Sequence, residues 1–111
     1  MDRTAINELV ERALTTVADL AVIELVRKLR VEPYPVEREW NYGAPGQKCV
    51  CWTFFEHPES NTGIAYCEHG FGPEYPWGLV AIRGPYMSMG MSDGWFPSLD
   101  QAVRESMAWE V

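Results

Sequence analysis

The segment from Cys49 to His69 constrains the fold more than any other part of this 111-residue chain. Two runs rich in aromatic and β-branched residues flank the stretch from Pro58 to Asn61, whose residue types favour a turn. Along each run the kind of side chain alternates with a period of two, as in a β-strand. The segment therefore predicts an antiparallel hairpin with strands over 47–56 and 62–68.

The register of this hairpin follows from the same alternation. Placing Trp52 opposite Tyr66 and Phe54 opposite Ile64 gathers large apolar side chains, together with Val50, on one face. The other face then carries Cys49, Cys51, Thr53, Phe55, Ala65, Cys67 and His69. A shift by one residue would mix the two sets, so we expect this register, with the first face in the core.

The second face holds the only group of residues with a recognisable chemistry. Three thiols (Cys49, Cys51 and Cys67) and the imidazole of His69 form a zinc-ligand set. Ligands two residues apart on a strand are separated by about 6.6 Å and converge poorly on a tetrahedron. We therefore rank zinc below the interpretation that the cysteines are small buried hydrophobic residues, and we expect no cofactor.

The cysteines also bear on location and on covalent links. Three is an odd number, which argues against a disulfide framework, and a Cys51–Cys67 disulfide is only a minor alternative. The first residues do not resemble a secretory leader, and no apolar run reaches the length of a membrane span. We expect a cytoplasmic protein with reduced thiols.

A helix is predicted over 3–30, because apolar residues recur there at helical spacing. Asp2 or Thr4 is suited to cap its start. A straight helix of this length would span about 42 Å, which is long for so small a domain. Either the helix kinks or breaks near Thr16, or one end projects and joins a second copy in a homodimer.

The rest of the chain predicts more strands and a second helix. Two prolines are expected to stop the first helix before a half-exposed strand over 36–42, in which Val36, Arg38, Trp40 and Tyr42 share one face. Further strands are predicted over 77–83 and 86–91. Ser98 begins a capping box, so a last helix is expected over 99–109, with Leu99, Ala102, Val103 and Met107 on its apolar face.

These elements predict a single α+β domain over residues 1–111. It has an antiparallel sheet of four to five strands within 36–91, flanked by a long helix over 3–30 and a short one over 99–109.

The net charge of −7 narrows the classes of partner. Residues 1–31 carry five acidic and five basic side chains, so the whole excess lies in residues 32–111, with eleven acids and four bases. Such a surface repels phosphate backbones and anionic membranes, and attracts a basic protein. We expect no nucleic acid and no membrane among its partners.

No catalytic motif stands out, so we expect a non-catalytic protein-binding module. Its specific form would be a small acidic inhibitor or immunity-type protein that binds a basic toxin or enzyme. The contact residues we assign are four acids and two aromatic anchors: Glu37, Glu39, Glu68, Glu74, Tyr75 and Trp77.

Two questions stay open at this level. The aromatic, glycine- and proline-rich loop over 70–77 is suited equally to a binding surface and to a lid on the core. The alternative function is a small-molecule-binding protein or cysteine-dependent enzyme, with a pocket near Cys49, Cys67 and His69.

Overall fold

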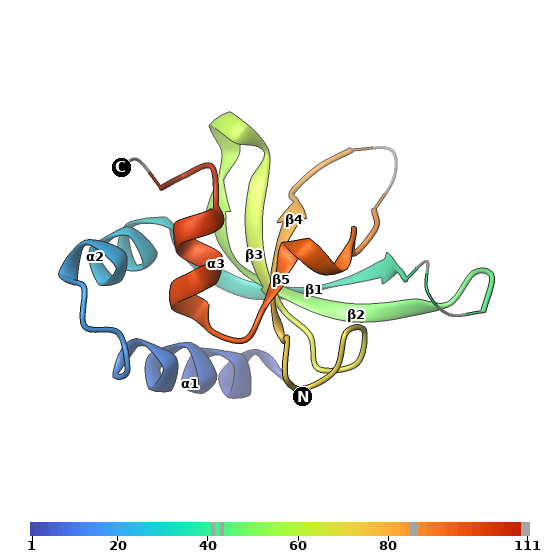
Figure 1. The fold of residues 1–111 in the computed structure, drawn as a ribbon, viewed down its shortest axis with the longest axis horizontal. Coiled ribbons are helices and arrows are strands. Elements are labelled where there is room, and N and C mark those ends of the chain that lie inside the picture. Colours follow the sequence, from blue (N-terminus) through green and yellow to red (C-terminus); the bar gives the residue numbers. More distant parts are fainter. Residues whose placement is uncertain (41, 43, 85–86, 110–111) are drawn as a thin grey trace.

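Helices lie against one side of an antiparallel sheet in the computed structural model, which describes residues 1–40, 42, 44–84 and 87–109 (Figure 1). The described helices are α1 (Arg3–Leu14), α2 (Leu20–Leu29) and α3 (Leu99–Glu105). The strands are β1 (Arg30–Glu39), β2 (Lys48–His57), β3 (Thr62–Tyr66), β4 (Trp77–Ala81) and β5 (Trp95–Phe96), and they form the sheet in chain order. Short 3₁₀ turns are η1 (Pro58–Ser60) and η2 (Ser92–Gly94). The α+β class expected from the sequence is confirmed.

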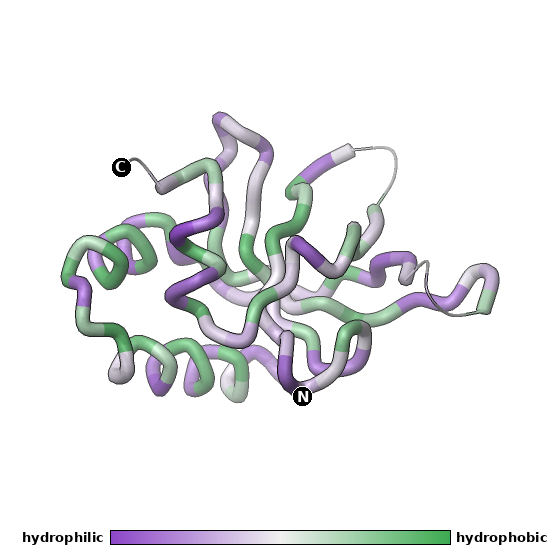
Figure 2. Tube along the Cα trace, viewed as in Figure 1, coloured by the Kyte–Doolittle hydropathy of each residue, from purple (hydrophilic) through white to green (hydrophobic). Residues whose placement is uncertain are grey.

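The predicted break near Thr16 is confirmed, because the region over 3–30 forms two helices, α1 and α2, rather than one long helix. The hydroxyls of Thr15 and Thr16 donate back to main-chain carbonyls of the previous turn, at 2.6 and 2.7 Å. Such bonds compete with helix continuation. Asp2 caps α1 by accepting from the amide of Ala5 at 2.9 Å. Figure 2 shows hydrophilic and hydrophobic residues alternating along α1, as expected for a helix with one buried side.

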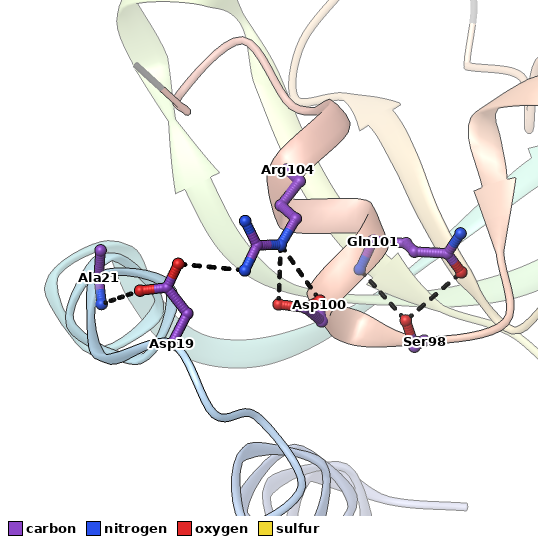
Figure 3. Close-up of polar contacts among 6 residues, drawn as sticks. All are labelled: Asp19, Ala21, Ser98, Asp100, Gln101 and Arg104. Atoms are coloured by element: carbon purple, nitrogen blue, oxygen red, sulfur yellow. Dashed lines mark hydrogen bonds and ion pairs between the residues drawn. The ribbon is translucent and has the colours of Figure 1, made fainter. Parts of the chain in front are cut away.

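The carboxylate of Asp19 links the start of α2 to α3 (Figure 3). Its carboxylate accepts from the amide of Ala21 at 2.9 Å, which caps α2. The same carboxylate binds the guanidinium of Arg104 in α3 at 3.1 Å, and Arg104 also binds Asp100 at 3.2 Å. The start of α2 is therefore held to α3 by a small ion-pair network.

Strand β1 begins directly after α2, earlier than the predicted range of 36–42. It includes Pro33 and Pro35, which were expected only to stop the helix. Proline lacks an amide donor and is tolerated on an edge strand, and β1 is an edge of this sheet. A register irregularity between Arg30 and Tyr34 accommodates the first proline.

The β2–β3 hairpin has the predicted register at one end only. Trp52 lies opposite Tyr66, as predicted. The predicted pair of Phe54 with Ile64 is wrong, since Ile64 lies opposite Phe55. A bulge at this point turns both phenylalanines into the same core, where each is 0% exposed.

The predicted fifth strand over 86–91 is not found, with Tyr86 lying outside the described residues. Only Ser88 makes a bridge there, to Glu39, and the fifth strand is β5. The segment does not present one buried face either, because Met89 is 1% exposed and Met91 is 67% exposed. Strand β4 ends at Ala81 rather than at residue 83.

Helix α3 is shorter than the predicted range of 99–109. Its Ser98 cap is confirmed, because the hydroxyl accepts from the amide of Gln101 at 3.2 Å. The chain leaves the helix at Ser106, whose backbone is extended. Met107 therefore lies outside the helix and is 73% exposed, so its assignment to the apolar face is wrong.

Two cores form on opposite sides of the sheet. The helix-side core contains Ile6, Val10, Leu14, Val22, Val26, Phe54, Phe55, Ile64, Tyr66, Trp77, Leu99, Ala102, Val103 and Ala108. The thiol-side core contains Cys49, Cys51, Ala65, Cys67, Val80, Met89 and Trp95. No helical residue belongs to this second core.

The thiol-side core is closed by the segment that precedes β5. Met87 and Met89 exchange main-chain hydrogen bonds with Glu39 on the free edge of β1, both at 3.0 Å. The indole of Trp95 in β5 donates to the carbonyl of Met89 at 2.7 Å. The chain thus reaches from β5 to the opposite edge of the sheet and covers the space between them.

Candidate functional site

A surface cavity of about 380 Å³ lies where β2 begins and β3 ends. Its lining residues are Met1, Lys48, Cys49, Val50, Trp52, Tyr66, Cys67, Glu68 and His69. The N-terminal end of the chain lies beside the loop that follows β3 (Figure 1). The cavity is therefore bounded by two strands, this loop and Met1.

The floor of the cavity is apolar and one wall is acidic. Val50 was expected in the core, but it is 43% exposed near the start of β2, and Trp52 beside it is half-buried. The phenol of Tyr66 donates a hydrogen bond to the carboxylate of Glu68. Burial, and then this hydrogen bond, raise the pKa of Tyr66, so the phenol stays neutral and holds the carboxylate in place.

Three of the four predicted contact acids gather around this cavity. Glu68 lines it, while Glu37 and Glu39 lie on β1 opposite the lining residues Val50 and Lys48. Glu37 is exposed, and Glu39 and Glu68 are half-buried. None of these three acids takes part in the ion pairs found among the described residues.

The predicted contact residues of the 70–77 loop differ in their exposure to solvent. Glu74 is exposed, and Tyr75 is 46% exposed. Trp77, in contrast, is 7% exposed and packs in the helix-side core, with ring centroids 5.7 Å from Phe54 and 4.9 Å from Tyr66. It cannot act as a surface anchor in this arrangement, because its ring already fills the core.

The same loop is in part a lid. Phe71 packs against the thiol-side core, 6.3 Å from Trp40 and 6.0 Å from Trp95 between ring centroids. A second cavity, of about 410 Å³, is lined by Phe71, Tyr75 and Ser92. Phe71 and Trp77 are therefore turned inward, as a lid requires, whereas Tyr75 is exposed, and binding by the exposed residues stays a prediction.

The predicted group of three thiols and an imidazole is only partly assembled. Cys49, Cys51 and Cys67 are free thiols, 7%, 0% and 2% exposed, and all three lie in the thiol-side core. His69 is exposed at the cavity rim. The described residues bring together no group of three or more His, Cys, Asp or Glu side chains suited to a metal ion, so the zinc alternative gains no support.

Arg38 is the residue whose placement the sequence did not foresee. It is 0% exposed, and its Nη2 donates to the carbonyl of Ala81 at 2.9 Å. Its Nε and Nη1 have no hydrogen-bond partner among the described residues. Burial lowers the pKa of Arg38, which marks a positive charge held in a poorly solvated place. The signal was its position between Val36 and Trp40 on one face of an alternating strand.

The chain matches no known family model, no curated protein and no solved structure. None of the described helices combines the length and the apolar character needed to cross a membrane.

Proposed function

We propose that this protein is a cytoplasmic, non-catalytic protein-binding module of the small acidic inhibitor or immunity type, and that it binds a basic toxin or enzyme. The observation that carries the proposal is the cavity between β2 and β3, with Glu68 in its wall and Glu37 and Glu39 on the neighbouring strand. Glu74 and Tyr75 on the adjoining loop extend the contact surface.

The charge distribution supports a basic partner. Most arginines are already neutralised within the chain, through pairs with acids of the helical layer and its surroundings: Arg3–Glu32, Arg27–Glu11, Arg30–Glu11, Arg104–Asp19 and Arg104–Asp100. Arg38 is buried. Lys48 is the one lysine or arginine among the described residues that line the cavity, and it lies opposite Glu39. Glu37, Glu39 and Glu68 outnumber it, so the surface around the cavity keeps a negative field, which speeds encounter with a positive surface.

The chemistry of the cavity fits one kind of anchor. Val50 and Trp52 offer an apolar floor for an aliphatic stem, and the Trp52 and Tyr66 rings attract a cation. Glu68 supplies a carboxylate at the same place. A lysine or arginine side chain of the partner combines both features, so we infer that such a side chain occupies the cavity.

Charge reversal tests this function. The variant Glu37→Lys/Glu39→Lys should lose capture of basic proteins from the native host, and its residual binding should depend less on salt. The matched control is Glu8→Lys/Glu24→Lys, which reverses two exposed charges on α1 and α2 instead. Unchanged capture and unchanged salt dependence in the first variant would end the electrostatic proposal.

A second candidate is favoured by the lining of the same cavity. Cys49, Cys67 and His69 all border it, as the alternative of a small-molecule-binding protein or cysteine-dependent enzyme requires. Thermal-shift screening of small molecules distinguishes the two functions, when combined with Val50→Trp to fill the cavity. Stabilising ligands that act on the native protein and not on this variant would favour the second candidate.

The homodimer through the N-terminal helix stays a prediction with a weaker basis. It depended on a projecting helix, whereas Ile6, Val10 and Leu14 of α1 are buried in the chain's own core. Light scattering at high concentration tests it, and a monomer would exclude it.

A further inference from the structure

We propose that Cys51 and Cys67 form a redox-responsive pair, in which Cys67 reacts first because it borders the cavity and Cys51 is the resolving thiol. The reagent is a small hydroperoxide that enters the cavity beside Cys67. This inference goes beyond the proposed function but uses the same cavity, so a partner side chain bound there would block the reagent, and the tests below use the free protein.

The backbone register places the two thiols together. Trp52 lies opposite Tyr66, and the next residues in the antiparallel register are Cys51 and Cys67. The Cys51 thiol makes only a long hydrogen bond, to the carbonyl of Cys49 at 3.8 Å, so no short bond holds it away from Cys67. Directly opposite residues have Cα atoms about 4.5–5.5 Å apart, which is within the ~4.4–6.8 Å that a disulfide spans. The pair is therefore able to form a disulfide with little backbone movement.

Arg38 supplies a buried positive charge that lacks an evident counter-ion. A guanidinium stays protonated in proteins, and a buried charge is costly unless it is paired. No carboxylate forms an ion pair with Arg38 among the described residues. Burial lowers the Arg38 pKa, while attraction to ionised Cys51 and then Tyr34 opposes this effect. A negative charge on the thiol pair is the balance that this position offers.

The surroundings of Cys67 favour its ionised form. The neighbouring Cys51 thiol, and then the main-chain amides of His69 and Gly70, lower the pKa of Cys67 to about 6 against the opposing effect of burial. Donors that point at a sulfur stabilise the thiolate over the thiol. The neighbouring Cys67, and then burial, raise the pKa of Cys51, so the pair carries one proton when Cys67 is ionised.

The other titratable groups around the pair do not remove this charge. Cys49 on β2 has a raised pKa because of its burial, so it stays a thiol. Tyr34 on β1 also stays neutral, since burial raises its pKa to about 12. His69 attracts the Cys67 thiolate from the loop after β3. The members of the thiol-side core from β4, β5 and the segment before β5 do not ionise: Val80, Trp95 and Met89.

The reaction balances in two steps. The Cys67 thiolate attacks one oxygen of the hydroperoxide, so an S–O bond forms, the O–O bond breaks, and the leaving oxygen takes a proton from water. The Cys51 thiol then attacks the Cys67 sulfur, forming the S–S bond and releasing water with the Cys51 proton. The two thiols are oxidised by two electrons and the hydroperoxide is reduced by two. Because Cys67 is 2% exposed, only reagents small enough for the cavity reach it.

An ultraviolet titration of the intact folded protein tests the charge state through thiolate absorbance. One thiolate per chain should appear with a midpoint near pH 6, against about 8.5 for an ordinary thiol. Cys67→Ser should abolish this transition, and the matched control Cys49→Ser should keep it. Arg38→Met, which removes the buried positive charge, should reduce the thiolate fraction at neutral pH. Arg38→Lys, which keeps the charge, should retain it. Absence of a thiolate below about pH 8 in the native protein would overturn the proposal.

Mild hydrogen peroxide treatment tests the chemistry. Peptide mass spectrometry should find the Cys51–Cys67 disulfide, with Cys49 still reduced. Cys51→Ser should instead accumulate sulfenic and then sulfinic acid at Cys67. Unreacted thiols at Cys67, or a disulfide that includes Cys49, would contradict the assigned roles.

Discussion

On one side of the sheet the buried side chains are apolar and come from all three described helices and from β2 to β4. On the other side, the thiol-side core shares its space with Arg38 and Thr53 and packs against Trp40. The four buried side-chain polar atoms without a hydrogen-bond partner in the described residues all belong to these three residues.

The two sides of the sheet therefore have different roles: the helix side stabilises the fold, and the thiol side is the candidate for chemical reactivity. Apolar burial on the helix side contributes most of the favourable free energy of folding. Unpaired polar groups on the thiol side oppose folding, because each has lost its water without a full replacement. The thiol-side core is therefore less stabilising than the helix-side core. Its unpaired polar groups lie beside three thiols, and we expect chemical reactivity at these thiols.

The largest effect should come from emptying the helix-side core. Phe54 is 0% exposed and contacts Trp77 edge to face. Phe54→Ala should lower the free energy of unfolding by about 3–5 kcal/mol, measured by urea denaturation. Val50→Ala, at a 43% exposed position of the same strand, is the control and should cost well under half as much. Equal losses would remove the distinction between core and surface on this strand.

Replacing the buried charge should act in the opposite direction. Arg38→Met removes an uncompensated guanidinium and should raise the free energy of unfolding by about 1–4 kcal/mol in acid. The pKa of Cys67 is lowered to about 6, so the thiolate's contribution is present above the ordinary thiol pKa and lost as pH falls through 6. The advantage of methionine should therefore be greatest below pH 6 and shrink above it, as followed by denaturation at several pH values. A strong loss of stability in acid would show that Arg38 has a counter-charge there.

A methyl group added at Gly78 should disturb the packing of the thiol-side core. A Cβ at Gly78 would lie 2.3 Å from the ring of Trp95, which cannot move without leaving the core. Gly78→Ala should cost roughly 1–3 kcal/mol of stability by overpacking. Gly94→Ala is the control, because its nearest contact would be 3.9 Å away. In a double-mutant cycle with Trp95→Leu, additive losses would contradict the steric explanation.

The smallest effect is expected at Tyr34, where it depends on pH. Burial, and then a hydrogen bond to Glu56, raise the pKa of Tyr34 to about 12, against about 10 for a free phenol. This contribution to stability is complete below pH 10 and is lost as pH rises through 12. Tyr34→Phe should therefore cost about 1 kcal/mol at neutral pH and flatten the alkaline decline. Tyr42→Phe is the control, because Tyr42 is 55% exposed. It should change neither the free energy of unfolding at neutral pH nor its decline in alkali.

The strands around the candidate site were predictable where a local pattern governs them. Alternation along 47–56 and 62–68 gave the correct pair of Trp52 and Tyr66, and it placed Cys49 and Cys67 on the same side. The bulge beside Phe54 was not predictable, since an extra residue in one strand preserves the apolar pattern while changing the partners. The acids were chosen for charge alone, and three of them gather at the cavity because β1 lies beside β2.

By itself, the sequence determined the α+β class, the hairpin, the Asp2 and Ser98 caps and the acidic half of the chain. These features depend on neighbours a few residues apart, whose periodicity and side-chain chemistry are read directly. Only the tertiary structure decided that Arg38 is buried and Trp77 is core. Burial on the thiol side is set when the segment at Met87 to Met89 reaches Glu39, about fifty residues earlier in the chain. No local pattern contains that contact, because covering a face of a sheet depends on where a distant segment packs.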